Sequence, residues 1–84
     1  MKMNKLSISK IANMIEQDWK NVHYAARPYL DAMKTLNSIK DNYYLDSGSS
    51  VIAYFLSNSN SWRGAVARDV KKELNRRLKE DVRS

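Results

Sequence analysis

The sequence predicts an all-α fold, a compact bundle of about four helices that forms a single helical domain over residues 1–84. Three observations carry this prediction. Apolar residues recur at three- and four-residue steps along most of the chain, as they do on one face of a helix. Turn formers are scarce, with 2 Gly and 1 Pro, whereas β-rich folds need more of them. A length of 84 residues suits one domain and no more.

The first helix is expected from Ser7 to about Tyr24 or Ala26, with Ser7 or Ser9 as its N-cap. Its apolar stripe comprises Ile8, Ile11, Ala12, Ile15, Trp19, Val22 and Ala26. Residues 8–15 also look like the first helix of a DNA-reading helix-turn-helix. However, Glu16 stands where the turn of that motif favours glycine, and an unbroken stripe favours one long helix.

Three segments follow. Pro28 suits a first helical turn, so a second helix is expected from Pro28 to about Leu36. Residues 40–46 are either a loop with aromatic anchors or a frayed helical turn. Asp46 to Ser50 offers several N-caps for the apolar run Val51–Leu56. That run has strand propensity, but its helical neighbours favour a short buried helix at the centre of the core.

The last segment, Ser61–Ser84, reads as one amphipathic helix that is capped by Ser61 and lies outermost. This segment contains eight of the chain's 15 Lys and Arg residues and four acidic residues, so it carries +4 of the net charge of +6. Its apolar side is expected to comprise Val66, Val70, Leu74 and Leu78. Six of its eight cations are the predicted nucleic-acid contacts: Arg68, Lys71, Lys72, Arg76, Lys79 and Arg83. The alternative is a solvated surface without a partner.

Catalytic chemistry has little support in this sequence. One histidine and no cysteine leave no His/Cys nucleophile pair, and the carboxylates are too scattered for a dedicated metal site. We therefore expect no enzyme, no cofactor and no metal. The longest apolar run is too short to span a bilayer, and Met1 to Lys10 lacks the apolar core of a signal peptide. These features favour a cytoplasmic protein without a membrane partner.

A second candidate surface consists of aromatic residues and their neighbours. Tyr43 and Tyr44 are adjacent, so both cannot easily face the core, and one is expected to be exposed. Trp62, at the start of the last helix, is expected to pack back on the core, while Gly64 allows close approach of another backbone. The predicted partner contacts are Tyr43, Tyr44, Trp62, Arg63 and Gly64. A homodimer formed through uncovered apolar surface is a further alternative.

Several strings resemble a group of small uncharacterised proteins carried by phages, plasmids and conjugative elements of Gram-positive bacteria. They are residues 18–22, residues 25–33, residues 54–58 and Trp62-Arg63-Gly64. The resemblance implies an accessory protein of a mobile element, which binds DNA or inhibits a host defence complex such as a CRISPR nuclease. Many such inhibitors are acidic mimics of DNA, and a net charge of +6 departs from that pattern. The leading hypothesis is therefore a non-enzymatic protein that binds nucleic acid or a nucleoprotein, and the alternative is an inhibitor of a host defence protein.

Overall fold

The computed structural model describes residues 3–83, with side chains described up to residue 81. Over these residues a short 3-10 turn and four α-helices alternate with loops, and a two-stranded hairpin lies between the second and third helices. The elements are η1 (Met3–Lys5), α1 (Ile8–Asp18), α2 (Arg27–Met33), β1 (Asn42–Tyr43), β2 (Asp46–Ser47), α3 (Gly48–Ser57) and α4 (Ala65–Arg83). The predicted helical bundle is thus confirmed, but the fold is mostly α rather than all-α.

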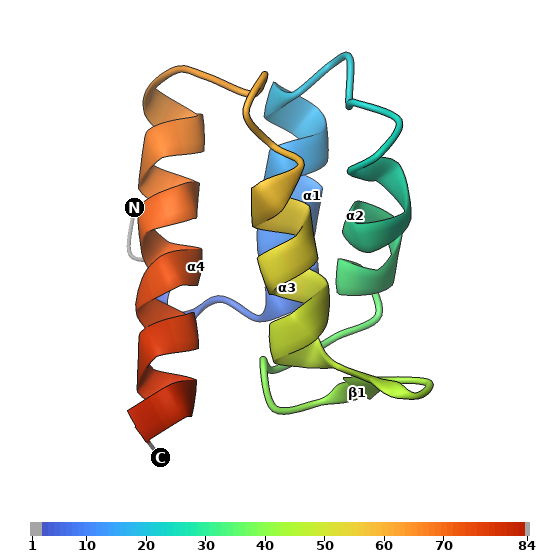
Figure 1. Cartoon of the computed structure of the whole chain (residues 1–84). Helices are drawn as coiled ribbons and strands as arrows, with labels where there is room; N and C mark the ends of the chain where they lie inside the picture. Colours follow the sequence, from blue (N-terminus) through green and yellow to red (C-terminus); the bar gives the residue numbers. More distant parts are fainter. Residues whose placement is uncertain (1–2, 84) are drawn as a thin grey trace.

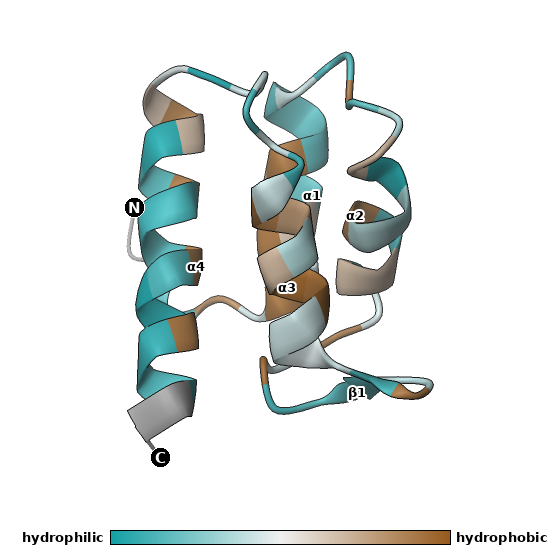
Figure 2. Ribbon diagram, in the orientation of Figure 1, coloured by the Kyte–Doolittle hydropathy of each residue, from teal (hydrophilic) through white to brown (hydrophobic). Residues whose placement is uncertain are grey.

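The helices α2 and α4 lie on opposite sides of α1 and α3, and each of them packs against both (Figure 1). Apolar side chains from all four helices meet in one core, whereas most of α4 is hydrophilic (Figure 2). The largest fully buried side chains include Ile11, Leu30, Phe55, Trp62 and Leu74. This arrangement leaves one long face of α4 directed away from the bundle.

The first helix begins where the sequence predicts and ends earlier. The hydroxyl of Ser7 accepts a hydrogen bond from the backbone N–H of Lys10 at 3.2 Å, which makes Ser7 the N-cap. The helix stops at Asp18 because Trp19 adopts an extended backbone, with φ −92° and ψ 90°. The predicted extension to Tyr24 or Ala26 is wrong. Ala26 is buried, but it lies in a loop and not in a helix. The loop of residues 19–26 is also longer than the three or four residues of a helix-turn-helix.

The second helix starts near Pro28 as predicted but ends at Met33, so the predicted extension to Leu36 is wrong. Leu36 is nevertheless buried, because the chain turns there instead of continuing along the helix axis. The carboxylate of Asp41 organises the next turn, where it accepts the backbone N–H groups of Asn37 and Ser38, both at 2.9 Å.

The hairpin is the main departure from the predicted fold. Asn42 pairs with Ser47 and Tyr43 with Asp46 in antiparallel register, so residues 40–46 form neither of the two predicted alternatives. Gly48 fixes the base of the hairpin. Its N–H donates to the carbonyl of Asp41 at 2.6 Å, and a Cβ on Gly48 would lie 2.6 Å from the carbonyl oxygen of Ile39. Close approach of backbones therefore occurs at Gly48, not at Gly64.

The third helix covers Val51–Leu56 as predicted, and Ser47 caps it by accepting the N–H of Ser50 at 3.1 Å. Val51, Ile52 and Phe55 are buried, so this helix supplies much of the core. The predicted buried helix at the centre of the core is thus buried on one face only, because Ala53 and Tyr54 are exposed.

The last helix starts at Ala65, and the predicted start at Ser61 is wrong. Gly64 precedes the helix with φ 114°, a conformation that L residues rarely adopt, and open space surrounds its missing side chain. The buried stripe of α4 is Ala67, Val70 and Leu74, with Leu78 partly buried. Val66 is exposed instead, which corrects its predicted place on the apolar side.

Candidate nucleic-acid interface

Two of the arginines on α4 are bound by acids of the same helix. Arg76 donates to Glu73 through Nε at 3.0 Å and Nη2 at 2.7 Å, and to Glu80 through Nη1 at 2.7 Å. Arg77 donates to Glu73 at 2.6 Å and to the carbonyl of Met3 at 2.6 Å. Arg76, and then Arg77, lower the pKa of Glu73 by hydrogen bonding. Arg76 is a predicted nucleic-acid contact, yet most of its donors already serve these carboxylates.

Lys71 holds the loop that precedes its own helix. Its ammonium donates to the carbonyl of Ser59 at 2.8 Å and to that of Trp62 at 2.7 Å, and lies 5.8 Å from the centre of the Trp62 ring. Burial lowers the pKa of Lys71, and the nearby charge of Arg63 adds to this effect. Lys71 therefore anchors residues 59–62, a role that its place in the basic stretch does not reveal.

The remaining cations of this region form what we call the outer basic stripe: Arg63, Arg68, Lys72 and Lys79. All four are exposed and none forms an ion pair within the described part of the chain. At about 100° per residue, Arg68, Lys72 and Lys79 fall within about 40° of one another on the helix. At about 1.5 Å per residue they extend over about 16 Å. Arg83, also predicted as a contact, has a side chain outside the described residues.

The N-terminal end of the outer basic stripe, at Arg63 and Arg68, borders a shallow depression of about 440 Å³. Its lining comprises Trp62, Arg63, Gly64, Ala65, Ala67, Arg68 and Lys71. Three of these residues are cationic, and the first turn of α4, which carries the positive end of the helix dipole, lies among them. The local electrostatics favour an anionic group.

Trp62 is part of the core. It is 2% exposed, its indole N–H donates to Asp18 Oδ2 at 2.8 Å, and its ring stacks on Trp19 with centroids 5.8 Å apart. Phe55 completes this cluster with its ring edge to face, 6.4 Å from Trp62. The expectation that Trp62 packs on the core is confirmed, and its buried ring leaves almost no surface for the predicted partner contact. The role of Asp18 was not predicted, because its partner is 44 residues away.

The predicted partner contacts do not form one surface. Tyr44 is 87% exposed at the tip of the hairpin and Tyr43 is half-buried, which confirms that one of the two is exposed. Leu45, next to Tyr44, is fully exposed and was missed. Figure 1 shows the hairpin at one end of the bundle and the loop of residues 58–64 at the other. Tyr44 therefore cannot share one contact with Arg63 and Gly64.

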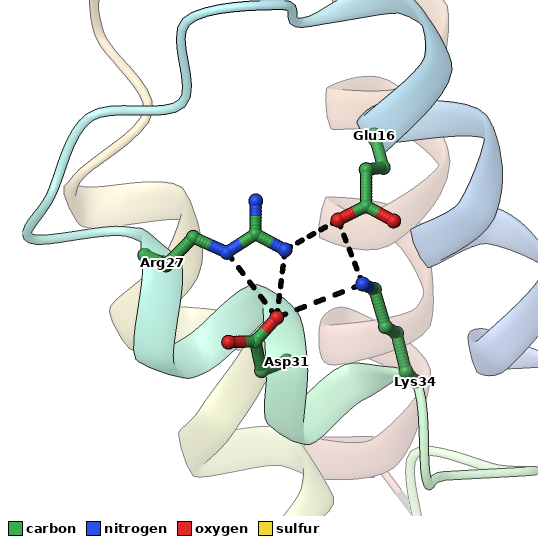
Figure 3. Close-up of polar contacts among 4 residues, drawn as sticks. All are labelled: Glu16, Arg27, Asp31 and Lys34. Carbon is green, nitrogen blue, oxygen red and sulfur yellow. Dashed lines mark hydrogen bonds and ion pairs between the residues drawn. The ribbon is translucent and has the colours of Figure 1, made fainter.

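Four charged side chains connect α1 to α2 (Figure 3). Glu16 accepts from Arg27 and, at 2.7 Å, from Lys34, while Arg27 also binds Asp31 at 2.7 Å. Hydrogen bonds from Arg27 and then Lys34 lower the pKa of Glu16. Glu16 is thus held as an ion-paired carboxylate, which does not suit a general acid. Among the described residues no three His, Cys, Asp or Glu side chains are grouped to hold a metal ion.

No helix in the described part of the chain is both long and apolar enough to cross a bilayer. Comparison of the chain with protein-family models, curated proteins and solved structures found no match. The proposals below therefore rest on the geometry of this chain.

Proposed function

We propose that this protein binds nucleic acid through the outer basic stripe of α4 and the loop before it. The observation that carries the proposal is the division among the cations of this region. Arg76 and Arg77 are held by Glu73, whereas Arg63, Arg68, Lys72 and Lys79 are exposed without an ion-pair partner among residues 3–81. Unpaired cations along one face can each replace the counterion of a phosphate.

The spacing of the stripe suits a phosphate backbone. Its length of about 16 Å along α4 is enough to reach several successive phosphates of one strand. The acids Glu73 and Glu80 are occupied by Arg76, and Asp69 is the exposed acid closest to the stripe in sequence. The surface therefore carries an excess of positive charge that a merely solvated helix does not require.

Equilibrium binding to labelled DNA and RNA at several salt concentrations tests the proposal. Four phosphate contacts predict a slope of log K against log salt of about −3.6 for a duplex, so affinity falls roughly 100-fold between 50 and 200 mM salt. The double variant Arg68→Glu/Lys72→Glu should lose most of this affinity. Lys5→Glu/Lys10→Glu is the matched control, since reversing two exposed cations lowers the net charge from +6 by 4 to +2 in both variants. Equal losses in the two variants would contradict the proposal.

A second candidate function is binding of a protein, such as a host defence nuclease, through the hairpin tip. Tyr44 has φ 55°, in a region where a residue other than glycine costs about 1–3 kcal/mol. It presents its ring to solvent beside the fully exposed Leu45. A strained turn that displays two apolar side chains favours a docking contact. Inhibition of a purified CRISPR nuclease would test it. Inhibition by the unaltered protein should depend little on salt and should be lost in the double variant Tyr44→Ser/Leu45→Ser. If the double variant still inhibits, the hairpin tip is excluded as the docking contact.

That the chain is an accessory protein of a mobile element stays a prediction from the resemblance. A homodimer formed through the hairpin tip is tested by light scattering over a range of concentrations. A constant monomer mass would exclude it.

A further inference from the structure

The end of the molecule that carries residues 58–64 also carries the loop of residues 19–26 (Figure 1). In that loop Tyr24 is 84% exposed, so its ring contributes little to the core. The ring stacks on His23, with centroids 4.6 Å apart and planes at 25°. His23 is held in turn, because its Nδ1 accepts the backbone N–H of Ala25 at 3.0 Å. The loop thus presents an oriented aromatic ring to solvent.

This ring is connected to the cations of the proposed interface through His23 and the segment of residues 57–64. A hollow of about 230 Å³ is lined by His23 together with Ser57, Asn58, Asn60 and Ser61. The same segment continues through Trp62 into Arg63 and the depression that Arg68 and Lys71 border. Residues 57–64 thus border both the hollow that His23 lines and the depression that three cations line. The side chains of Asn60 and Ser61 are exposed between them and form no hydrogen bond within the described part of the chain.

From this arrangement we infer that the interface selects single-stranded nucleic acid, with an unpaired base stacked on Tyr24 and the neighbouring phosphates at Arg63 and Arg68. The inference rests on the proposed function and adds the strand state of the ligand. Bases in a duplex are stacked on each other, so only an unpaired base can offer its face to an exposed aromatic ring. The amide of Asn60 and the hydroxyl of Ser61 are able to hydrogen-bond the edge of such a base.

The surroundings of Tyr24 favour a nucleic acid over a protein as the occupant. Protein hot spots lie within a patch that excludes water, whereas His23, on which Tyr24 stacks, borders a hollow lined by amides and hydroxyls. The other strongly exposed apolar side chains of the described chain, Tyr44 and Leu45, lie at the opposite end of the bundle. An exposed aromatic ring and a basic surface at one end of the molecule are the combination that single-strand binding proteins use.

Fluorescence anisotropy with labelled dT12, U12 and a 12-base-pair duplex at one salt concentration tests the inference. The protein should bind at least one single strand tenfold or more tighter than the duplex, and the tighter of dT12 and U12 identifies DNA or RNA. Loss of one stacked base weakens binding roughly tenfold to a hundredfold, so Tyr24→Ala should lose that much on the strand and little on the duplex. Tyr24→Phe keeps the stacking face and should stay within twofold. Tyr44→Ala removes an equally exposed tyrosine at the far end and should change nothing.

The failure of this inference differs from the failure of the proposed function. If Tyr24→Ala binds the strands as Tyr24→Phe does, or if strand and duplex bind equally, the inference is overturned. The proposed function then still stands, provided that Arg63→Glu/Arg68→Glu weakens binding to both. If the unaltered protein binds none of the three probes, both are overturned. Because Tyr24 is exposed, its replacement should not unfold the protein, and circular dichroism of each variant verifies this.

Discussion

The same substitution in two adjacent lysines of α4 should affect different properties of the protein, fold stability in one case and nucleic-acid binding in the other. Lys71 donates to two backbone carbonyls of the preceding loop, those of Ser59 and Trp62 at 2.8 and 2.7 Å. Lys72 is exposed and forms no such bond. Methionine keeps most of the aliphatic stem and removes the ammonium group. We therefore expect Lys71→Met to destabilise the fold and Lys72→Met to leave its stability unchanged while weakening nucleic-acid binding.

The magnitude follows from the two hydrogen bonds and from what opposes them. A hydrogen bond to a charged group contributes about 1.5–3 kcal/mol. Burial lowers the pKa of Lys71, which means that desolvation of its charge offsets part of this gain. Water can also reach the loop in the variant and satisfy one carbonyl. We expect a net loss of about 1–2 kcal/mol for Lys71→Met, against less than about 0.5 kcal/mol for an exposed site such as Lys72.

Urea unfolding followed by tryptophan fluorescence measures this difference, because Trp19 and Trp62 stack beside the anchored loop. Thermal unfolding is a second readout, since 1 kcal/mol corresponds to a shift in Tm of about 4–8 °C for a domain of this size. Equal unfolding free energies for the two variants would refute the anchoring role of Lys71. It would then join Lys72 as an ordinary surface cation.

Three further outcomes concern stability. Arginines lower the pKa of Glu73 below its usual 4.5, so its contribution is present above that pH and is lost as the pH falls through the lowered folded-state value. Glu73→Gln should therefore be less stable than the unaltered protein at pH 7 in urea titrations, by an amount that shrinks at pH 3. Asp18→Ala leaves the buried indole N–H of Trp62 without its acceptor and should cost about 1–3 kcal/mol, and an unchanged urea midpoint would contradict this. Gly48→Ala would place a Cβ 2.6 and 2.7 Å from two backbone carbonyl oxygens and should cost about 1–3 kcal/mol, measured by thermal unfolding against a Ser49→Ala control.

The elements that the sequence predicted correctly are those determined by neighbouring residues. Ser7 and Ser47 each cap a helix by accepting an N–H three residues ahead, so the signal and its effect lie in one turn. The hairpin could not be predicted in this way. Its strands have two residues each, and Tyr44 takes a positive φ where glycine or asparagine is the usual signal. At its base the N–H of Gly48 donates to the carbonyl of Asp41, and the backbone of Ile39 leaves no room for a side chain at Gly48.

The end of α1 escaped prediction for a different reason. Trp19 and Ala26 keep the spacing of a helical stripe because both are buried, but they reach the core from a loop. Spacing reports burial and does not by itself report backbone conformation. The position of Arg68, Lys72 and Lys79 on one side of the last helix was predictable from periodicity, whereas Arg63 lies before that helix. The ion pair of Arg76 with Glu73 is suggested by their spacing of three residues on one helix. The anchoring role of Lys71 is not, because it depends on where the preceding loop folds.

The anchoring of residues 59–62 by Lys71 also explains why Arg63 stays near Lys71 in the free protein. Asp18 holds the indole of Trp62, and Lys71 holds the carbonyl of the same residue, so the position of Arg63 is fixed by its neighbour. The charge of Arg63 in turn lowers the pKa of Lys71, a sign of repulsion between two like charges that line one depression. A phosphate placed between them removes that repulsion without any reordering of the loop. Binding energy is then not spent on ordering the site, which is the advantage of a preorganised surface.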